Sequence, residues 1–150
     1  FKNTFIRFFI HRYKIDMSIA EQSDHTKYAD FNSFFTRSLI RTTRPVVTGS
    51  HEIACPVDGT VSQAGPISAD RLFQAKGYNY RLEALLGGAT EHAATFNNGS
   101  FATLYLSPKD YHRIHMPITG TLKEMIYIPG RLFSVNKRAA CHIPNLFTRN

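Results

Sequence analysis

Two short polar segments of the sequence carry side chains that could do chemistry. The first, Pro56–Thr60, holds Asp58 in a turn-like Asp-Gly pair, and the second, Asp110–Pro117, holds His112 and His115. An Asp and a His brought together by the fold would form the back half of a Ser-His-Asp relay, in which the carboxylate orients the imidazole and stabilises its charged form. Taken alone, an Asp-Gly pair between strands is usually only a turn.

The two histidines also permit a metal-binding interpretation. His112 and His115 could lie on one helical face, with a third ligand from Asp58, Cys141 or His142. None of these has a diagnostic spacing, and a His-x-x-His pair alone is weak evidence. A metallohydrolase of β-sandwich-hybrid fold that uses His112 and His115 is therefore kept as an alternative function.

The composition is typical of one folded, basic domain. Of the 150 residues, 43% are apolar, including twelve Phe and seven Tyr, and 19% are charged, which excludes a disordered chain. No stretch approaches the length of apolar residues that a membrane-spanning helix needs. The two cysteines, Cys55 and Cys141, form no CxxC pair, which argues against a disulfide framework and favours a reducing compartment.

The formal net charge of +7 is unevenly distributed. The first fourteen residues contain four cations and no acid, and no acid follows Glu124, whereas Arg131, Lys137, Arg138 and Arg149 do. Basic surfaces of this kind bind phosphates, either of anionic lipids or of nucleic acid. A basic nucleic-acid-binding module is a second alternative, although no recognised nucleic-acid motif occurs.

The elements that must position the candidate residues begin with a helix over residues 1–14. On a helical wheel, five polar side chains fall on one narrow arc and seven apolar ones, mostly Phe, on a broad opposite arc. An aromatic, basic amphipathic helix is the composition of an interfacial membrane anchor, and packing of the Phe face onto the domain core is the other interpretation.

Short helices are expected over residues 18–40, with a capping box at Ser18–Glu21 and a cap at Asp30. Strands are expected at 53–56, 60–64, 101–106 and 122–128. A short helix is expected over Tyr80–Leu86, with Asn79 as its N-cap and Gly87-Gly88 as its end. The predicted class is α+β: residues 1–40 form a membrane-facing helical region, and 50–150 form a β-rich, barrel-sandwich-like body.

Longer blocks around the candidate residues resemble phosphatidylserine decarboxylases of the bacterial and mitochondrial type. These blocks, in sequence order, are Phe31–Arg37, Pro56–Gly59, Gln74–Tyr80, Leu82–Leu86, Tyr105–Pro117 and Pro129–Asn136. The resemblance runs from about Phe5 to Asn150 without obvious gaps. Because several blocks in the same order are far more specific than any short motif, the sequence is identified as a member of this family.

The resemblance implies a pyruvoyl-dependent lyase that is made as a zymogen and undergoes autocatalytic cleavage. In the family, the serine of a Leu-Gly-Ser-Thr motif attacks the preceding glycine carbonyl, and elimination leaves a pyruvate-derived pyruvoyl group on a small α subunit. This group forms a Schiff base with phosphatidylserine, which loses CO2 and becomes phosphatidylethanolamine. The implied role is phospholipid biosynthesis.

The resemblance also assigns roles to the candidate residues. Asp58 and His115 match the relay that activates the serine, because a hydroxyl is a poor nucleophile until a base takes its proton. We expect their side chains to lie within hydrogen-bonding reach. His112 is expected near the substrate, where it acts in decarboxylation as proton donor or contact. No metal ligand and no other cofactor-binding residue is implied.

No Leu-Gly-Ser-Thr motif occurs in these residues, and the two Gly-Ser pairs, Gly49-Ser50 and Gly99-Ser100, lack the flanking Leu and Thr. The chain starts at Phe1 rather than Met. We therefore expect part of a β subunit that lacks the pyruvoyl-bearing C-terminal segment and is inert alone.

The expected partners are phosphatidylserine, an anionic membrane surface and the α subunit from the same proenzyme, without nucleic acid. A homodimer of αβ units is left open. The expected location is peripheral, on the cytoplasmic face of a bacterial cell membrane.

Overall fold

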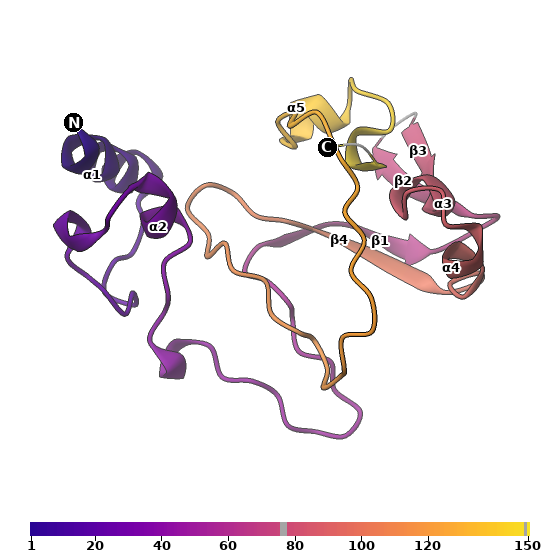
Figure 1. The fold of residues 1–150 in the computed structure, drawn as a ribbon, viewed down its shortest axis with the longest axis horizontal. Coiled ribbons are helices and arrows are strands. Elements are labelled where there is room, and N and C mark those ends of the chain that lie inside the picture. The colour runs from indigo at the N-terminus through magenta and orange to yellow at the C-terminus, as the bar shows by residue number, and fades with distance from the viewer. Residues whose placement is uncertain (76–77, 149) are drawn as a thin grey trace. The chain divides into compact units, whose positions relative to one another are not determined.

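A computed structural model of the chain describes residues 1–75, 78–148 and 150 (Figure 1). Two compact units share the chain, and neither is continuous in sequence: unit 1 comprises Phe1–Thr60 and Leu104–Thr121, and unit 2 comprises Val61–Thr103 and Leu122–Asn150. Short helices and two two-stranded sheets confirm the α+β class. Neither sheet closes into a barrel among the described residues, so the barrel-like part of the prediction is not seen.

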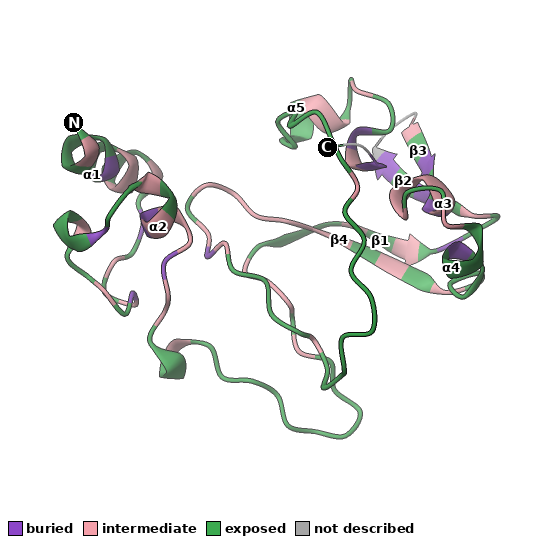
Figure 2. Ribbon diagram, in the orientation of Figure 1, coloured by how far each residue is buried: buried purple, intermediate pink, exposed green. Residues whose placement is uncertain are grey.

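Unit 1 is built around helix α1 (Lys2–Tyr13), as predicted. The helix ends where Lys14 adopts a left-handed conformation with φ of 52°. Its Ile6 is fully buried and shares a core with Ile15, Tyr28 and Phe34, whereas three aromatic side chains of the same helix, Phe1, Phe5 and Phe8, are exposed (Figure 2). Some apolar side chains of α1 therefore pack in the core, and others lie on the surface. No helix in the described part of the chain is long and apolar enough to cross a bilayer.

Helix α2 (Phe31–Phe35) packs against α1, between the short turns η1 (His25–Lys27) and η2 (Arg41–Thr43). Asp30 caps it, as predicted, because its carboxylate accepts a hydrogen bond from the Ser33 amide at 2.7 Å while the Ser33 hydroxyl receives one from the Asp30 amide at 3.1 Å. The ring of Phe9 on α1 meets that of Phe31 edge-on at 5.0 Å. The cap and the ring contact both hold the N-terminal end of α2.

The capping box expected at Ser18–Glu21 is wrong. Asp16 instead accepts hydrogen bonds from the amide and hydroxyl of Ser18, at 2.9 and 2.7 Å, and forms a turn. Ala20 then pairs with Leu39 in an isolated antiparallel bridge. A local side-chain bond to the backbone has replaced the helix start.

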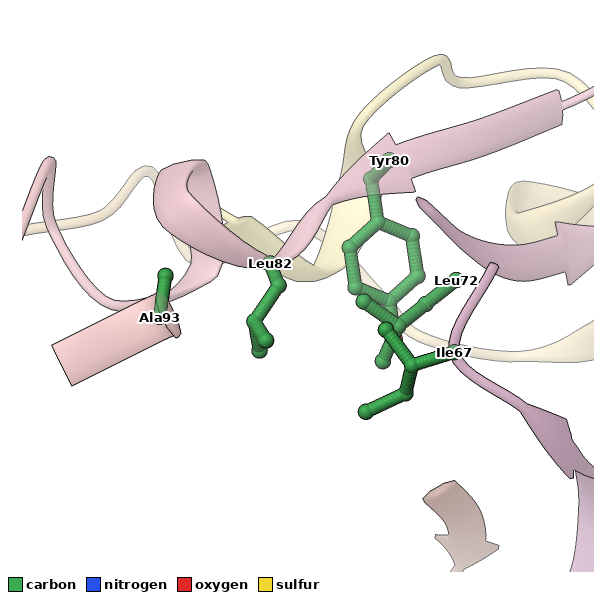
Figure 3. Close-up of a cluster of buried hydrophobic side chains, with 5 residues drawn as sticks. All are labelled: Ile67, Leu72, Tyr80, Leu82 and Ala93. Carbon is green, nitrogen blue, oxygen red and sulfur yellow. The ribbon is translucent and has the colours of Figure 1, made fainter. Parts of the chain in front are cut away.

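Unit 2 contains the strands, two of which extend slightly into the sequence of unit 1. Strand β1 (Thr60–Pro66) pairs with β4 (Ser100–Tyr105), which confirms two predicted strands, and β2 (Arg71–Ala75) pairs antiparallel with β3 (Tyr78–Arg81). The unit also has helices α3 (Leu82–Leu85), α4 (Thr90–Ala94) and α5 (Lys137–Ala140) and the turn η3 (Leu146–Thr148). Its core, drawn in Figure 3, contains Ile67, Leu72, Tyr80, Leu82 and Ala93.

The helix predicted over Tyr80–Leu86 is too long at its start. Tyr80 belongs to β3, and α3 begins at Leu82, whose amide donates to the Asp70 carbonyl at 3.0 Å. Cross-strand pairing of Tyr80 with Leu72 has overridden the local cap at Asn79. The predicted end is confirmed, since Gly87 and Gly88 both have positive φ, 75° and 94°.

The strand predicted over 122–128 is also wrong, and residues 53–56 are irregular as well. Leu122, Met125 and Tyr127 are 80%, 88% and 87% exposed, and no described strand pairs with this segment. Alternating apolar residues favour a strand only where a partner covers one face. Within the block Gln74–Tyr80, Lys76 and Gly77 lie outside the described residues, as does Arg149 of the basic C-terminal group.

Candidate functional site

The turn that carries Asp58 and the segment that carries His115 are joined by their backbones in unit 1. The His115 amide donates to the Pro56 carbonyl at 2.8 Å, and the Ala54 amide donates to the Pro117 carbonyl at 3.0 Å. Asp58 and His115, which are 57 positions apart in sequence, thereby lie on two hydrogen-bonded backbone segments. The two predicted segments are brought together.

Gly59 fixes the turn directly after Asp58. Its φ is 156°, and a Cβ added there would lie 2.5 Å from the backbone oxygen of Tyr105. No other residue type fits without moving the backbone, because real Cβ atoms do not approach an oxygen so closely. The Asp-Gly pair is therefore a turn in which Gly59 lies closely against the end of β4.

The Asp58 carboxylate is held by Arg44. The Arg44 Nε lies 2.9 Å from each carboxylate oxygen of Asp58, and Nη2 lies 2.5 Å from Oδ2. This hydrogen bond raises the pKa of Arg44. A bidentate ion pair of this kind orients the carboxylate as well as neutralising it.

The His115 imidazole bonds to Tyr111. Its Nε2 lies 2.9 Å from the Tyr111 hydroxyl, and the two rings stack with centroids 5.5 Å apart. Tyr111 is buried and so provides a firm support for the more exposed histidine. Asp58 and His115 thus lie on bonded segments, but each side chain has its own partner, and no hydrogen bond between their side chains is present in this structure.

His112 is separated from this pair and lies against helix α2. Its ring stacks on Phe35 with centroids 4.0 Å apart and an interplanar angle of 24°, and its Nε2 lies 3.1 Å from the Ser107 carbonyl oxygen. Burial lowers the pKa of His112, and Arg37 adds to the lowering, whereas the Ser107 carbonyl and Asp110 act in the opposite direction. The neutral imidazole therefore predominates at pH 7.

A cavity of about 190 Å³ adjoins these residues. Its lining includes Tyr111, four cationic side chains (Lys14, Arg37, Arg44 and Lys109) and three carboxylates (Asp16, Asp58 and Asp110). Charges of both signs therefore line the cavity, and Arg44 is already paired with Asp58. The sequence analysis did not identify Arg37, Arg44 or Tyr111, although Arg37 and Tyr111 lie inside the blocks that carry the family resemblance.

The metal-binding interpretation finds no support in the described residues, where no group of three or more His, Cys, Asp and Glu side chains could hold a metal ion. The Nε2 atoms of His112 and His115 have different hydrogen-bond partners, a carbonyl and a phenol. With Cys141 and His142 in unit 2, the predicted ligands are also divided between the two units.

A carboxylate and an imidazole on bonded loops, with a cavity lined by charged side chains of both signs, are the parts of a site for acid–base chemistry. The comparisons with known proteins agree in kind: the family model described as phosphatidylserine decarboxylase matches residues 31–150. The chain belongs to this family.

Curated relatives cover nearly the whole chain. Proteins named phosphatidylserine decarboxylase proenzyme are 59% identical over 97% of the chain in Shewanella denitrificans, 56% over 99% in Marinobacter nauticus and 53% over 100% in Pseudomonas aeruginosa. The chain spans about half the length of each, 50% to 52%. The family assignment made from the sequence blocks is confirmed.

Proposed function

We propose that this chain is part of the β subunit of a phosphatidylserine decarboxylase, which converts phosphatidylserine to phosphatidylethanolamine and CO2. The observation that carries the proposal is the backbone pairing of His115 with Pro56, because it holds an imidazole beside the turn of Asp58 in a chain of this family. The remainder of the longer protein would supply the serine.

In self-cleavage, His115 takes the proton of the serine hydroxyl, and Asp58 stabilises the resulting imidazolium. The buried Tyr111 holds the ring of His115, and Arg44 orients the Asp58 carboxylate. Two movements would bring the Asp58 carboxylate to the imidazole. Either the His115 side chain rotates away from Tyr111, or the carboxylate binds both Arg44 and His115.

The residues around the 190 Å³ cavity fit a pyruvoyl group. The ammonium groups of Lys14 and Lys109 line this cavity and suit the two carbonyl oxygens of a keto-amide. When bound, this group supplies the carbonyl that accepts the electrons left by departing CO2. His112 contacts the substrate or, once it has taken up a proton, returns it to the α-carbon; its lowered pKa makes the protonated ring a stronger acid.

The complete proenzyme tests this function. We expect it to divide into two subunits on a gel and to release CO2 from carboxyl-labelled phosphatidylserine, whereas His115→Ala stays uncut and releases none. Normal cleavage of His115→Ala would remove His115 from the relay, and a cleaved protein that releases no CO2 would refute the decarboxylase assignment.

We further propose that α1 attaches the protein to the membrane surface on which its substrate lies. Phe8 is 61% exposed on a helix whose surface also carries Arg7 and Arg12. Aromatic side chains enter the interface while cations bind anionic head groups. Phe8→Ser should weaken sedimentation of the complete protein with phosphatidylserine-containing vesicles. Phe96→Ser, at a side chain 52% exposed in unit 2, is the matched control and should not.

A further inference from the structure

Arg37 is a buried cation whose donors are not all used. Only 3% of its surface is exposed, and its Nε and Nη1 atoms are buried without a hydrogen-bond partner. Arg37 follows the end of helix α2, and its guanidinium carbon lies 5.6 Å from the ring centre of Phe34 in that helix. The aromatic contact holds the group in place but leaves its hydrogen-bonding capacity unsatisfied.

A guanidinium keeps its charge in a protein, so burial without an anion is unfavourable. Two exposed arginines in the described part of the chain have carboxylate partners: Arg44 pairs with Asp58, and Arg81 pairs with Asp70 and Glu83. No carboxylate within the described residues forms an ion pair with Arg37. The planar fork of the guanidinium suits a ligand with two or more oxygens.

Arg37 lines a second, larger cavity of about 360 Å³ in unit 1. A second guanidinium, that of Arg113, borders the same cavity and is held in place by a hydrogen bond from its Nε to the Thr36 carbonyl at 2.7 Å. The neutral polar lining includes Gln22, Ser33 and Ser38, and Glu21 is the one acid among the lining residues. Two guanidinium groups and the hydroxyls of Ser33, Ser38 and Tyr28 around one space suit a tetrahedral anion.

We propose that Arg37 and Arg113 bind a phosphate-class anion in this cavity, namely the phosphodiester of the phospholipid head group. The assignment to a lipid rests on the proposed function. Arg37 also lines the 190 Å³ cavity that Asp58 borders. A head group held by its phosphodiester at Arg37 would therefore place its remaining atoms next to the catalytic cavity.

Direct binding to the complete protein tests this site. The probe is N-acetyl-glycerophosphoserine, whose blocked amine cannot react with a carbonyl, and N-acetylserine is the matched compound without phosphate. Calorimetry should show binding of the first compound and much weaker binding of the second. Arg37→Lys, which keeps the charge but loses the fork, should weaken binding of the phosphodiester about tenfold or more.

Arg113→Gln tests the same cavity from an exposed position and should weaken binding in the same direction even if Arg37→Lys fails to fold. Arg41→Lys, at an exposed arginine of unit 1 outside both cavities, is the matched control and should bind as the unchanged protein does. Unchanged affinity in both the Arg37 and Arg113 variants would overturn the proposal. Equal affinity for inorganic phosphate and for the phosphodiester would overturn its assignment to a lipid head group.

Kinetics separate this inference from the proposed function. With short-chain phosphatidylserine, Arg37→Lys should raise KM about tenfold while self-cleavage stays normal. Loss of self-cleavage with KM unchanged in the remaining active fraction would make Arg37 structural and overturn its binding role. If the unchanged protein releases no CO2, the proposed function fails, while phosphodiester binding at Arg37 is judged by calorimetry alone.

Discussion

The Nε of Arg44 is equidistant from the two carboxylate oxygens of Asp58, at 2.9 Å from each. The acid of the proposed relay is therefore oriented by a cation fourteen positions earlier in the sequence, before any histidine engages it. Asp58 therefore supplies both a negative charge and a fixed position, and substitutions can test the two separately.

Asp58→Asn in the complete proenzyme keeps the side-chain shape but removes the charge that stabilises an imidazolium. We expect uncut proenzyme to accumulate, measured by gel mobility over time. Asp70→Asn is the matched control, because Asp70 also pairs with an arginine, Arg81, but belongs to unit 2. Normal processing of Asp58→Asn would exclude its charge from the cleavage step.

His112→Ala should leave self-cleavage intact and strongly reduce CO2 release, because His112 lies on Phe35 and Ser107 rather than with the Asp58 turn. Subunit formation on a gel and CO2 release are measured on the same sample. His51→Ala, at an exposed histidine, provides the comparison. Blocked cleavage in His112→Ala would assign His112 to the relay or to the structure of its segment.

The lowered pKa of His112 makes the stability of unit 1 depend on pH. In the unfolded chain His112 takes up a proton near its usual pKa of about 6.5, whereas the folded protein resists protonation until a lower pH. The contribution of His112 to stability is therefore complete above about pH 6.5 and is lost as the pH falls toward the folded-state pKa.

Urea unfolding of the complete protein at pH 7.5 and 5.5 measures this effect. We expect a smaller loss of stability between these two pH values in His112→Gln, which cannot take up a proton, than in the unchanged protein. An equal loss in both proteins would assign the pH dependence to other groups.

Gln74 is the main polar link between β2 and the C-terminal segment of unit 2. Only 2% exposed, it donates to the carbonyls of Ala140 and Ile143 at 2.9 and 2.8 Å and accepts from the Leu146 amide at 2.9 Å. Gln74→Leu leaves these three backbone groups without partners and should lower the free energy of unfolding by about 3 kcal/mol.

Thermal or urea unfolding of the complete protein measures that loss. Gln63→Leu, at a half-buried glutamine of β1 that makes no described side-chain hydrogen bond, should change stability far less. Equal destabilisation by the two substitutions would mean that the hydrogen bonds of Gln74 contribute nothing specific.

Elements with strong local signals were predictable from the sequence. Helix α1, the Asp30 cap and strands β1 and β4 follow from periodicity and cap chemistry, which act over a few neighbouring residues. The segment 122–128 has equally strong strand residues, but a strand needs a pairing partner, and local sequence does not specify one.

The candidate site was predictable only as far as the family blocks reach. Those blocks identified Asp58, His112 and His115, but their side-chain partners depend on tertiary packing. The Arg44–Asp58 ion pair spans fourteen residues and has no periodic signature. The free donors of Arg37 became apparent only when its burial was known.

The discontinuous sequence of unit 1 sets an order of events during synthesis. Residues 1–60 leave the ribosome first, but the bonds that seat His115 on Pro56 and Pro117 on Ala54 cannot form until all of Val61–Thr103 has been made. Because nascent chains fold largely from the N-terminus onward, unit 1 must wait, incomplete, while the middle of the chain emerges. The base proposed for self-cleavage thus joins the Asp58 turn only after Val61–Thr103, a segment that belongs to the other unit, has been made.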